Sequence, residues 1–232
     1  MAVTLDSTLV GTGSINGANS IVLSAFSTGG TNRLVLVLTD ESSDPATVSS
    51  VTATGLTFVK VKSVNKGTSQ GNVEMWGAWA AAQQTSVVIT VNLTGTNFPQ
   101  GSATTYCFSG TDTTGTVVAT IGATSTFASL SSSAPTANIT TTRNNSLCIA
   151  AVGCDINTTT TAGSGQTIDT NVISAGGFSE INSMRQSATT ATSGTVVTMN
   201  ATSVAVHPYG LLAVEILSPA GVSANSNFFT FL

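Results

Sequence analysis

The feature that most constrains the fold is an apolar pattern with a period of two, which runs through nearly the whole chain. β-branched residues dominate these runs, and clusters of Gly, Asn, Asp and Ser separate them. Successive side chains of a strand point to opposite faces of a sheet, so this period is typical of strands that bury one face. No window shows a convincing helical stripe. The pattern therefore predicts an all-β protein.

Twelve strands are expected, six in each half of the chain. The first six are predicted at residues 20–26, 33–39, 56–64, 72–80, 86–93 and 103–109. The second six are predicted at residues 136–142, 146–152, 166–173, 179–187, 195–201 and 209–217.

The two series of strands correspond to each other. Asn-Arg-Leu at 32–34 opens an apolar run, and Asn-Ser-Leu at 145–147 opens another. Leu34 and Leu147 are 113 residues apart, whereas Glu74 and Glu180, in a later pair of matching runs, are 106 apart. Changes in loop length explain so small a drift. The sequence therefore predicts an internal duplication with a period of about 110 residues.

The expected organisation is a single jelly-roll-like β-sandwich of about twelve strands in two packed sheets. A half with six strands would have a thin core and exposed edges, which favours one shared core over two domains. The segment 111–133 keeps apolar residues and does not resemble a clean linker. We expect an N-terminal arm at 1–19, a sandwich at 20–218 with pseudo-repeats 20–110 and 134–218, and a C-terminal tail at 219–232. Two separate domains remain the alternative.

Charged residues are scarce, and this argues against several kinds of partner. They make up 7% of the chain, against about 25% in ordinary soluble proteins. Only six residues are basic and the net charge is −4, so neither a nucleic acid nor an anionic membrane is an expected partner. The surface must instead be covered by Ser, Thr, Asn, Gln and Gly, which suits a virion surface or sugar contacts.

The first ten residues contain no basic and apolar pattern of a signal peptide. The protein is therefore expected to be made in a host cytoplasm and to reach its site without secretion. Cys107, Cys148 and Cys154 are odd in number and lack metal-ligand spacing. We expect them to be small buried hydrophobic residues rather than disulfides or metal ligands.

Several runs in the predicted order resemble a jelly-roll pattern of bacteriophage virion proteins and of related bacterial proteins. They are Gly-Leu-Thr-Phe-Val at 55–59, Val-Glu-Met-Trp at 73–76, Thr-Ser-Val-Val-Ile-Thr-Val at 85–91 and Phe-Ser-Gly at 108–110. The resemblance extends over about residues 20–217 and is stronger in the first half. It implies a capsid decoration, head-fibre or tail-fibre protein, and it implies no enzymatic activity.

Three groups of residues are candidates for sites of chemistry. The single histidine, His207, has no marked nucleophile or carboxylate partner, so we expect it at a strand entry. Glu74 and Glu180 could form the carboxylate pair of a glycosidase, but alternation favours an outer-face position for Glu74. The acidic residues at 40, 41 and 44 are interpreted as a solvated turn rather than a Ca²⁺ site. We therefore expect no catalytic residue, metal or cofactor.

Four aromatic residues carry polar atoms: Trp76, Trp79, Tyr106 and Tyr209. Trp79 and Tyr106 are expected to fill the core, because alternation places Trp79 on the same face as Val73. Trp76 shares its predicted face with Glu74 and is the candidate for stacking on a glycan.

The C-terminal tail is the expected docking element. A spacer of small residues leads to Phe228, Phe229, Phe231 and Leu232. Large apolar residues at a chain end are a liability in a monomer, so they either fold back as a strand or dock on a neighbouring subunit. Docking is the favoured interpretation.

The leading hypothesis is a non-enzymatic phage virion protein that decorates or cements a capsid, or forms part of a fibre. Its expected partners are other virion proteins and further copies of itself. The alternative is a carbohydrate-binding or receptor-binding module, and a glycoside hydrolase is the least favoured reading.

Overall fold

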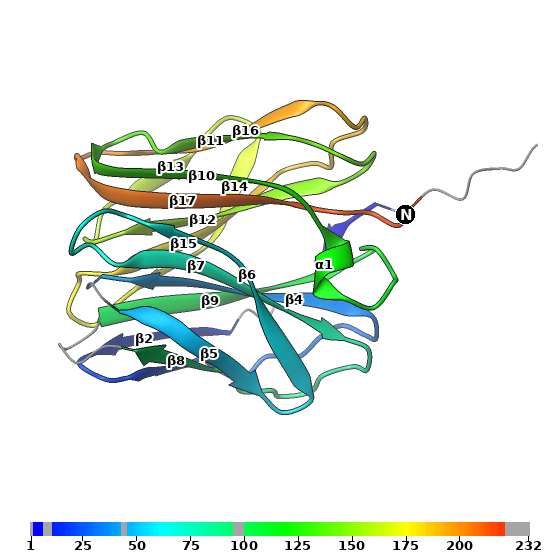
Figure 1. The fold of residues 1–232 in the computed structure, drawn as a ribbon, viewed down its shortest axis with the longest axis horizontal. Coiled ribbons are helices and arrows are strands. Elements are labelled where there is room, and N and C mark those ends of the chain that lie inside the picture. The colour runs from blue at the N-terminus through cyan, green and yellow to red at the C-terminus, as the bar shows by residue number, and fades with distance from the viewer. Residues whose placement is uncertain (1, 7–10, 43–45, 95–99, 221–232) are drawn as a thin grey trace, which may run out of the picture.

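The protein is an all-β sandwich, as the sequence predicts (Figure 1). The computed structural model describes residues 2–6, 11–42, 46–94 and 100–220. Within these ranges it contains 17 strands and one helix of four residues, α1 (Val117–Thr120). The strand number is therefore larger than the twelve expected.

The strands of the first half precede α1. They are β1 (Thr4–Leu5), β2 (Thr12–Asn16), β3 (Ser20–Val22), β4 (Arg33–Glu41), β5 (Thr47–Ala53), β6 (Leu56–Asn65), β7 (Asn72–Ala80), β8 (Thr90–Thr94) and β9 (Gln100–Ser109). The strands of the second half follow α1. They are β10 (Ile121–Ser132), β11 (Thr136–Thr140), β12 (Leu147–Cys154), β13 (Thr160–Ala162), β14 (Gln166–Ile173), β15 (Glu180–Gln186), β16 (Val196–Ser203) and β17 (His207–Ile216).

All twelve expected strands are present, and β7 and β14 have the predicted bounds. Five others, β1, β2, β5, β10 and β13, were not predicted. Two of them lie in the expected arm at 1–19 and pair with β9. Another, β10, occupies much of the segment 111–133, and its side chains are exposed or only half-buried. A Ser- and Thr-rich strand that buries little apolar surface gives a weak alternation signal, which explains why it was missed.

The neighbour order of the strands is the same in both halves. In the first half, β2-β9-β4-β7-β6 form one layer and β3-β8-β5 form the other. Adding eight to each number gives the second half, with β10-β17-β12-β15-β14 and β11-β16-β13. Eight antiparallel strands in two such layers form a jelly roll. Because β5 pairs with β6, the first half is one continuous sheet, so there are three sheets where two were expected.

Two matched turns have the same backbone conformation in both halves. Asn32 and Asn145, just before β4 and β12, have φ angles of 55° and 57°. Asn is among the few residues other than Gly that adopt such angles readily. Gly55 and Gly165 occupy the third position of the turns before β6 and β14, with φ angles of 77° and 71°. The correspondence between the two halves of the sequence thus coincides with matching backbone geometry.

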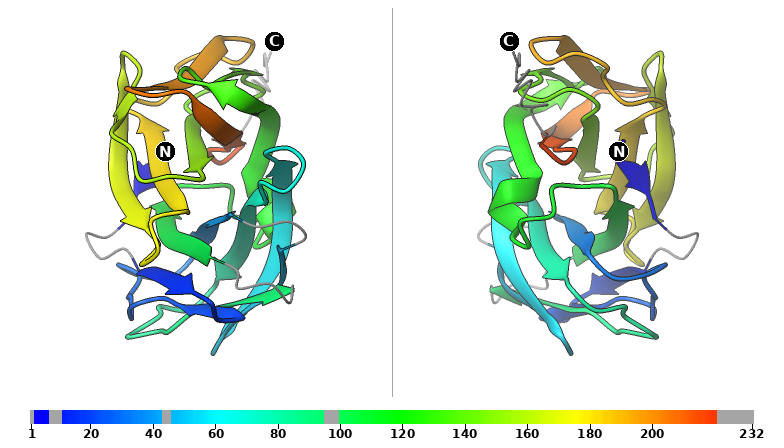
Figure 2. Two further views of the ribbon diagram at one scale, coloured as in Figure 1. Left: turned by 90° about the vertical axis from the view of Figure 1, so that its left-hand side faces the viewer. Right: turned by 90° about the vertical axis from the view of Figure 1, so that its right-hand side faces the viewer.

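Figures 1 and 2 show how the strand layers are stacked. Three apolar clusters lie between these layers. One fills the interior of each jelly roll, around Val37 in the first half and Met184 in the second. The third lies between the halves, where Leu36 of β4 and Ile149 of β12 belong to one cluster with Leu212 of β17. The larger layers of the two jelly rolls therefore face each other, and the smaller layers lie outside.

Replacing Leu212 with alanine tests this shared cluster. Leu212 is 0% exposed, so Leu212→Ala is expected to lower the free energy of unfolding by about 2–5 kcal/mol. Because the cluster joins the halves, a single urea transition followed by fluorescence and circular dichroism should move to lower urea. The matched control is Val204→Ala, because Val204 is 84% exposed. Two separate urea transitions, of which the substitution affects only one, would contradict a shared core.

Candidate functional site

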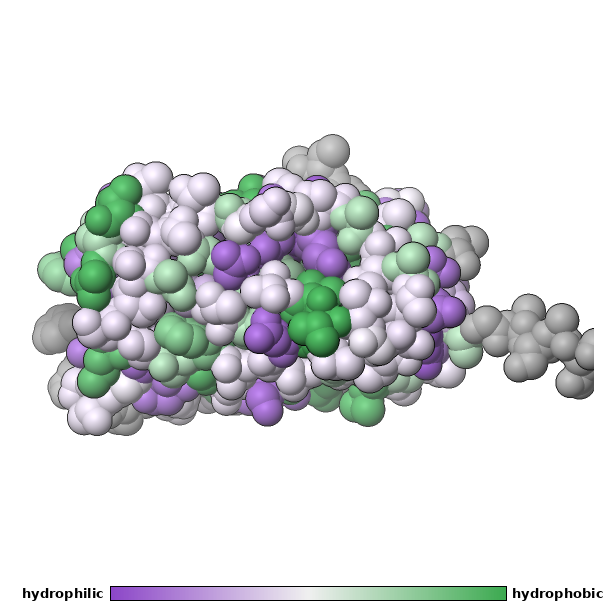
Figure 3. Space-filling view, turned by 90° about the horizontal axis from the view of Figure 1, so that it is seen from above, coloured by the Kyte–Doolittle hydropathy of each residue, from purple (hydrophilic) through white to green (hydrophobic). Residues whose placement is uncertain are grey.

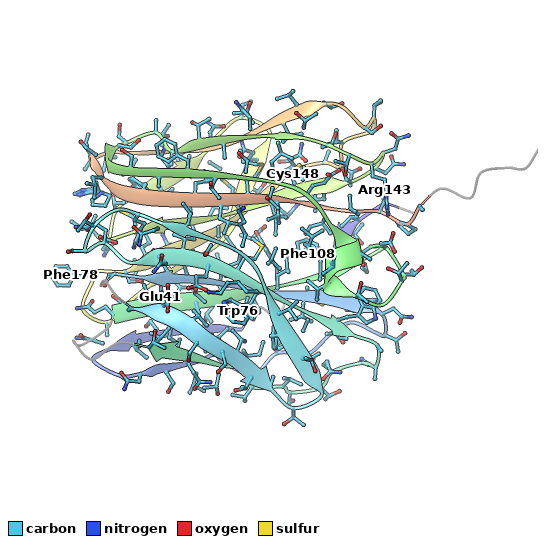
Figure 4. The ribbon with its side chains drawn as sticks, in the orientation of Figure 1. Glu41, Trp76, Phe108, Arg143, Cys148 and Phe178 are labelled. Atoms are coloured by element: carbon cyan, nitrogen blue, oxygen red, sulfur yellow. The ribbon has the colours of Figure 1, made fainter. Side chains whose placement is uncertain are left out.

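The predicted docking residues Phe228, Phe229, Phe231 and Leu232 lie outside the described residues. The surface that leads to them is described, because β17 ends at Ile216 and the chain can be followed to Ala220. This surface is the candidate site. It lies at the end of the molecule where Arg143 is found (Figure 4).

Arg143 holds the chain that leaves β17. Its Nη1 donates to the carbonyl oxygen of Ser218 at 2.7 Å and to Asp112 Oδ2 at 2.5 Å. The Ser218 hydroxyl donates to the carbonyl oxygen of Asn144 at 2.7 Å. Burial alone would raise the pKa of Asp112, but Arg143 and the Thr114 amide lower it below its ordinary value. The last described turn is thus fixed by a charged side chain and two carbonyl groups.

Glu215 supports the Arg143 loop from inside. It is 0% exposed, and it accepts hydrogen bonds from the amides of Ala123 (3.0 Å), Thr142 (2.9 Å) and Arg143 (3.2 Å). Burial alone would raise the pKa of Glu215, but the Ala123 amide, the Ser146 hydroxyl and Thr142 lower it. A carboxylate with several donors is stable in its charged form although it is buried.

A shallow hollow of about 390 Å³ opens beside this loop. Its lining is formed by the turn at 142–145 together with Ser193, Ser218 and Pro219. Arg143 is the one charged residue in that lining. The hollow offers amides, hydroxyls and carbonyls and lacks the paired acid, base or nucleophile of a hydrolase.

Trp76 is half-buried rather than open on a face (Figure 4). It packs against the core of the first jelly roll, and its Nε1 donates to Glu74 Oε2 at 3.0 Å. The Lys60 ammonium lies 5.1 Å from the centre of its ring. The polar edge of the ring is therefore occupied by Glu74, while part of the ring remains accessible. Stacking on a glycan stays a prediction.

The alternation along β7 is confirmed, but the outer-face position of Glu74 is wrong. Val73 and Met75 face the other half, whereas Trp76 and Ala78 face the interior of the first jelly roll. Glu74 lies on that interior face and is 1% exposed, because the small layer with β5 covers it and the Val48 amide donates to it at 3.1 Å. Its charge is paired with Lys60 at 2.6 Å.

Glu180 does not meet Glu74. It is 0% exposed in the second half and accepts from the Thr158 amide at 2.8 Å and from the side-chain amides of Asn171 and Asn182. The two carboxylates bind separate partners in separate halves, so the structure does not bring them together as a pair.

The expected solvated turn at Asp40, Glu41 and Asp44 is also wrong for its first two members. Both belong to β4 and are 0% exposed, and Asp44 lies outside the described residues. Burial and the nearby Glu74 raise the pKa of Glu41 well above its ordinary value. Asp40 points to the other half and pairs with Lys66 at 2.7 Å. The strand continues three residues past the apolar run that ends at Leu38, and this buries both carboxyl groups.

The remaining predictions for single residues are mostly confirmed. Tyr106 is 1% exposed, whereas Trp79 is only half-buried. The three cysteines are free and buried, and burial raises the pKa of Cys148 to about 12. His207 is the first residue of β17, at a strand entry as expected. Lys66, Asp155, Arg143 and Glu215 were not singled out from the sequence, because a single charged residue beside a strand normally faces solvent.

Most charged side chains of the described residues bind other groups of the same chain. Five of the six basic residues form ion pairs: Arg33 with Asp6, Lys60 with Glu74, Lys66 with Asp40 and Asp155, Arg143 with Asp112, and Arg185 with Asp169. Glu180 and Glu215 are held by hydrogen bonds. The face over the outer layer of the second half is dominated by residues of intermediate hydropathy, with small separate hydrophilic and hydrophobic spots (Figure 3).

Among the described residues, no group of three metal-ligating side chains comes together, and no helix has the length and apolar character needed to cross a bilayer. Comparison of the chain with protein-family models, with curated proteins and with solved structures finds no match.

Changing Glu215 to glutamine should destabilise the Arg143 loop in a pH-dependent way. The loss of charged hydrogen bonds is expected to lower the free energy of unfolding by about 1–3 kcal/mol at pH 7. The folded pKa of Glu215 is lowered, so its stabilisation is complete above the unfolded pKa of about 4.3. It is then lost as the pH falls through the folded pKa.

Urea denaturation of both proteins between about pH 3 and pH 7 measures this effect, because the window brackets the ordinary carboxyl pKa. The difference between wild type and variant should shrink toward the acidic end. A difference that stays constant with pH would show that the Glu215 charge does not stabilise the loop. Thr161→Val, on an exposed position, is the control.

Proposed function

We propose that this protein is a non-enzymatic structural component of a phage virion, which acts through its surfaces as a capsid decoration or fibre protein. The observation that carries the proposal is the use of charge. Almost every described ion pair and buried carboxylate holds strands or loops together, and this leaves few charges free on the surface of a packed double jelly roll. Jelly rolls occur in viral capsid and lectin domains.

The anchored C-terminal turn supports docking through the tail. Arg143, Asp112 and Ser218 fix the chain at a defined point of the surface. The segment that follows carries four large apolar residues within its last five positions. A segment leaving from a fixed point loses less entropy on docking than one leaving from a mobile end. We propose that Phe228, Phe229, Phe231 and Leu232 bind a neighbouring subunit, either another virion protein or a copy of this chain.

We also infer that the two halves arose by duplication. The support is threefold: the strand order repeats, Asn32 and Asn145 share a φ angle that few residues adopt, and Gly55 and Gly165 occupy matching turns. The duplicated unit is one jelly roll of about 110 residues.

Purified virions test the proposal directly. Quantitative mass spectrometry of particles should find the protein at a fixed ratio to the major capsid protein or to a fibre subunit. A chain lacking residues 228–232 is expected to fall at least about tenfold in particles, because losing four buried apolar side chains removes several kcal/mol.

The truncated chain must keep the urea transition of the full chain, which separates docking from folding. Absence of the full chain from particles would overturn the virion assignment. Equal incorporation of both chains would overturn only the role of the tail.

The second candidate function is binding of a glycan or a glycosylated receptor. The observation that favours it is Trp76, whose ring is partly accessible beside Lys60, in a chain rich in Ser, Thr and Asn. Sugars bind to aromatic faces and to neutral hydrogen-bonding groups, and neither contact needs net charge.

A glycan array separates this candidate from the first. Trp76→Ala should abolish binding, while Trp76→Phe should retain part of it because it keeps the ring and removes only the Nε1 donor to Glu74. Trp79→Ala is the matched control, since Trp79 lies on the same strand and is also half-buried. Binding that survives Trp76→Ala, or no binding by the wild type, would contradict a role for this ring.

A further inference from the structure

A buried lysine joins the two halves of the molecule. Lys66 lies in the turn between β6 and β7, and its side chain is 0% exposed. Its Nζ donates to Asp40 Oδ1 at 2.7 Å and is also in direct contact with Asp155 Oδ1. Asp40 belongs to the first half, whereas Asp155 follows β12 in the second. One amine is thus held between two carboxyl groups with no exposure to solvent.

Ser179 and Ser102 fix the geometry of this cluster. The Ser179 hydroxyl lies 2.8 Å from Asp40 Oδ2 and 2.9 Å from the Ser102 hydroxyl, and both serines are 0% exposed. Asp40 therefore has a bonding partner on each carboxyl oxygen. Asp155 contacts Lys66 but has no further hydrogen bond to Oδ1, and 13% of its side chain is exposed.

The second half provides a notch that admits these side chains. Gly153 of β12 and Gly210 of β17 are directly paired across the two strands. A Cβ atom at Gly153 would lie 2.2 Å from Asp40 Oδ1, and one at Gly210 would lie 3.0 Å from Lys66 Cγ. Larger residues at either position would push the cluster apart. The space left by the two glycines is occupied by Asp40 and Lys66, so the second half is shaped to accept this charged cluster.

We propose that Lys66 and Asp155 form an intramolecular isopeptide bond, with Asp40 as the group that transfers the protons. The Lys66 amine attacks Cγ of Asp155, a bond forms between Nζ and Cγ, and the bond from Cγ to one carboxyl oxygen breaks. The product is an amide that links the two jelly rolls covalently.

The atoms and charges of this reaction balance without an external reagent. An ammonium and a carboxylate give one amide and one water molecule, and no electron is gained or lost. Of the three ammonium protons, one stays on the amide nitrogen and two leave with the departing Asp155 oxygen. Asp40 accepts one proton from Lys66 along their hydrogen bond before the attack and a second from the same nitrogen after the N–C bond has formed. It passes each in turn to that oxygen and returns to its starting state.

Burial favours each step. Burial raises the pKa of Asp40 to about 7 against the effect of Lys66, so Asp40 can both accept and release a proton near neutrality. Burial also raises the pKa of Asp155, which favours the neutral acid that an amine can attack. Burial disfavours the ammonium, but the two carboxylates raise the pKa of Lys66 while both are charged. Once Asp40 has accepted a proton it is neutral, and it no longer raises the pKa of Lys66.

The product is also more easily buried than the reactants. A charged pair must be desolvated, whereas a neutral amide costs less in an apolar interior. The partly exposed side of Asp155 gives the released water a path to solvent. Amine and carboxyl are held in contact, so the reaction gains from proximity.

Intact mass spectrometry of the denatured full chain tests the proposal. The wild type should weigh less than its sequence by one water molecule, and peptide mapping should find a branched peptide joining Lys66 to Asp155. Lys66→Met, Asp155→Ala and Asp40→Asn should each have the full mass of their sequences. Lys62→Met is the matched control, because Lys62 is an exposed lysine near the same turn, and it should still lose the water.

A cut between the halves identifies the partner of Lys66. A protease site inserted between Thr114 and Gly115 lies in an exposed stretch of the loop before α1. After cleavage, the wild-type halves should migrate together on a denaturing gel, and those of Lys66→Met should separate.

Three outcomes would overturn the proposal. A wild type with its full mass shows that the cluster is an ion pair only. A loss of water that persists in Lys66→Met places the reaction elsewhere. A branched peptide joining Lys66 to Asp40, with halves that separate after cleavage, shows that Asp155 is not the acceptor. The wild-type measurements do not depend on any variant folding.

Discussion

Burial of two sheet faces against each other is the contact on which the rest of the structure depends. Each jelly roll encloses its own small core, but its larger layer also has an apolar outer face, with Leu34, Leu36 and Leu38 on β4. In water that face would be a large apolar patch. The matching face of the second half covers it through β12 and β17. Both faces of the central strands are therefore buried, which explains their nearly continuous apolar sequences.

Buried charged groups determine how the two sheet faces align with each other. A buried ion pair adds little to stability, since desolvation offsets the attraction, but a buried charge without a partner is costly. Lys66 and Asp40 meet Asp155 and Ser179 only when the two halves dock as observed, over the notch at Gly153. The cluster therefore opposes other alignments of two otherwise featureless apolar faces. Arg143 and Glu215 play a comparable part for the loops that leave the sheets.

The sequence predicts the parts of this structure that depend on local pattern. Period-two alternation identifies twelve of the strands, and the repeated turns at Asn32 and Asn145 mark the two matching halves. It misses β5, although Val48 and Val51 of that strand are buried. Edge strands such as β10, with Ser and Thr at most exposed positions, lack that signal. The positions of charges are not local either. Alternation places Glu74 on a strand face that the sequence predicts to be exposed. Glu74 is buried because the layer with β5 covers that face. The cluster at Lys66 joins residues from both halves, so no single segment reveals it.

The face-to-face stacking also determines how the molecule can meet its surroundings. The small layers β3-β8-β5 and β11-β16-β13 lie at opposite ends of the stack (Figures 1 and 2). They occupy corresponding places in two related units and differ in sequence. One chain is thus built like a dimer whose two subunits have been free to diverge. Such a molecule presents two non-identical outer layers at its opposite ends, without the symmetry that a true dimer would impose.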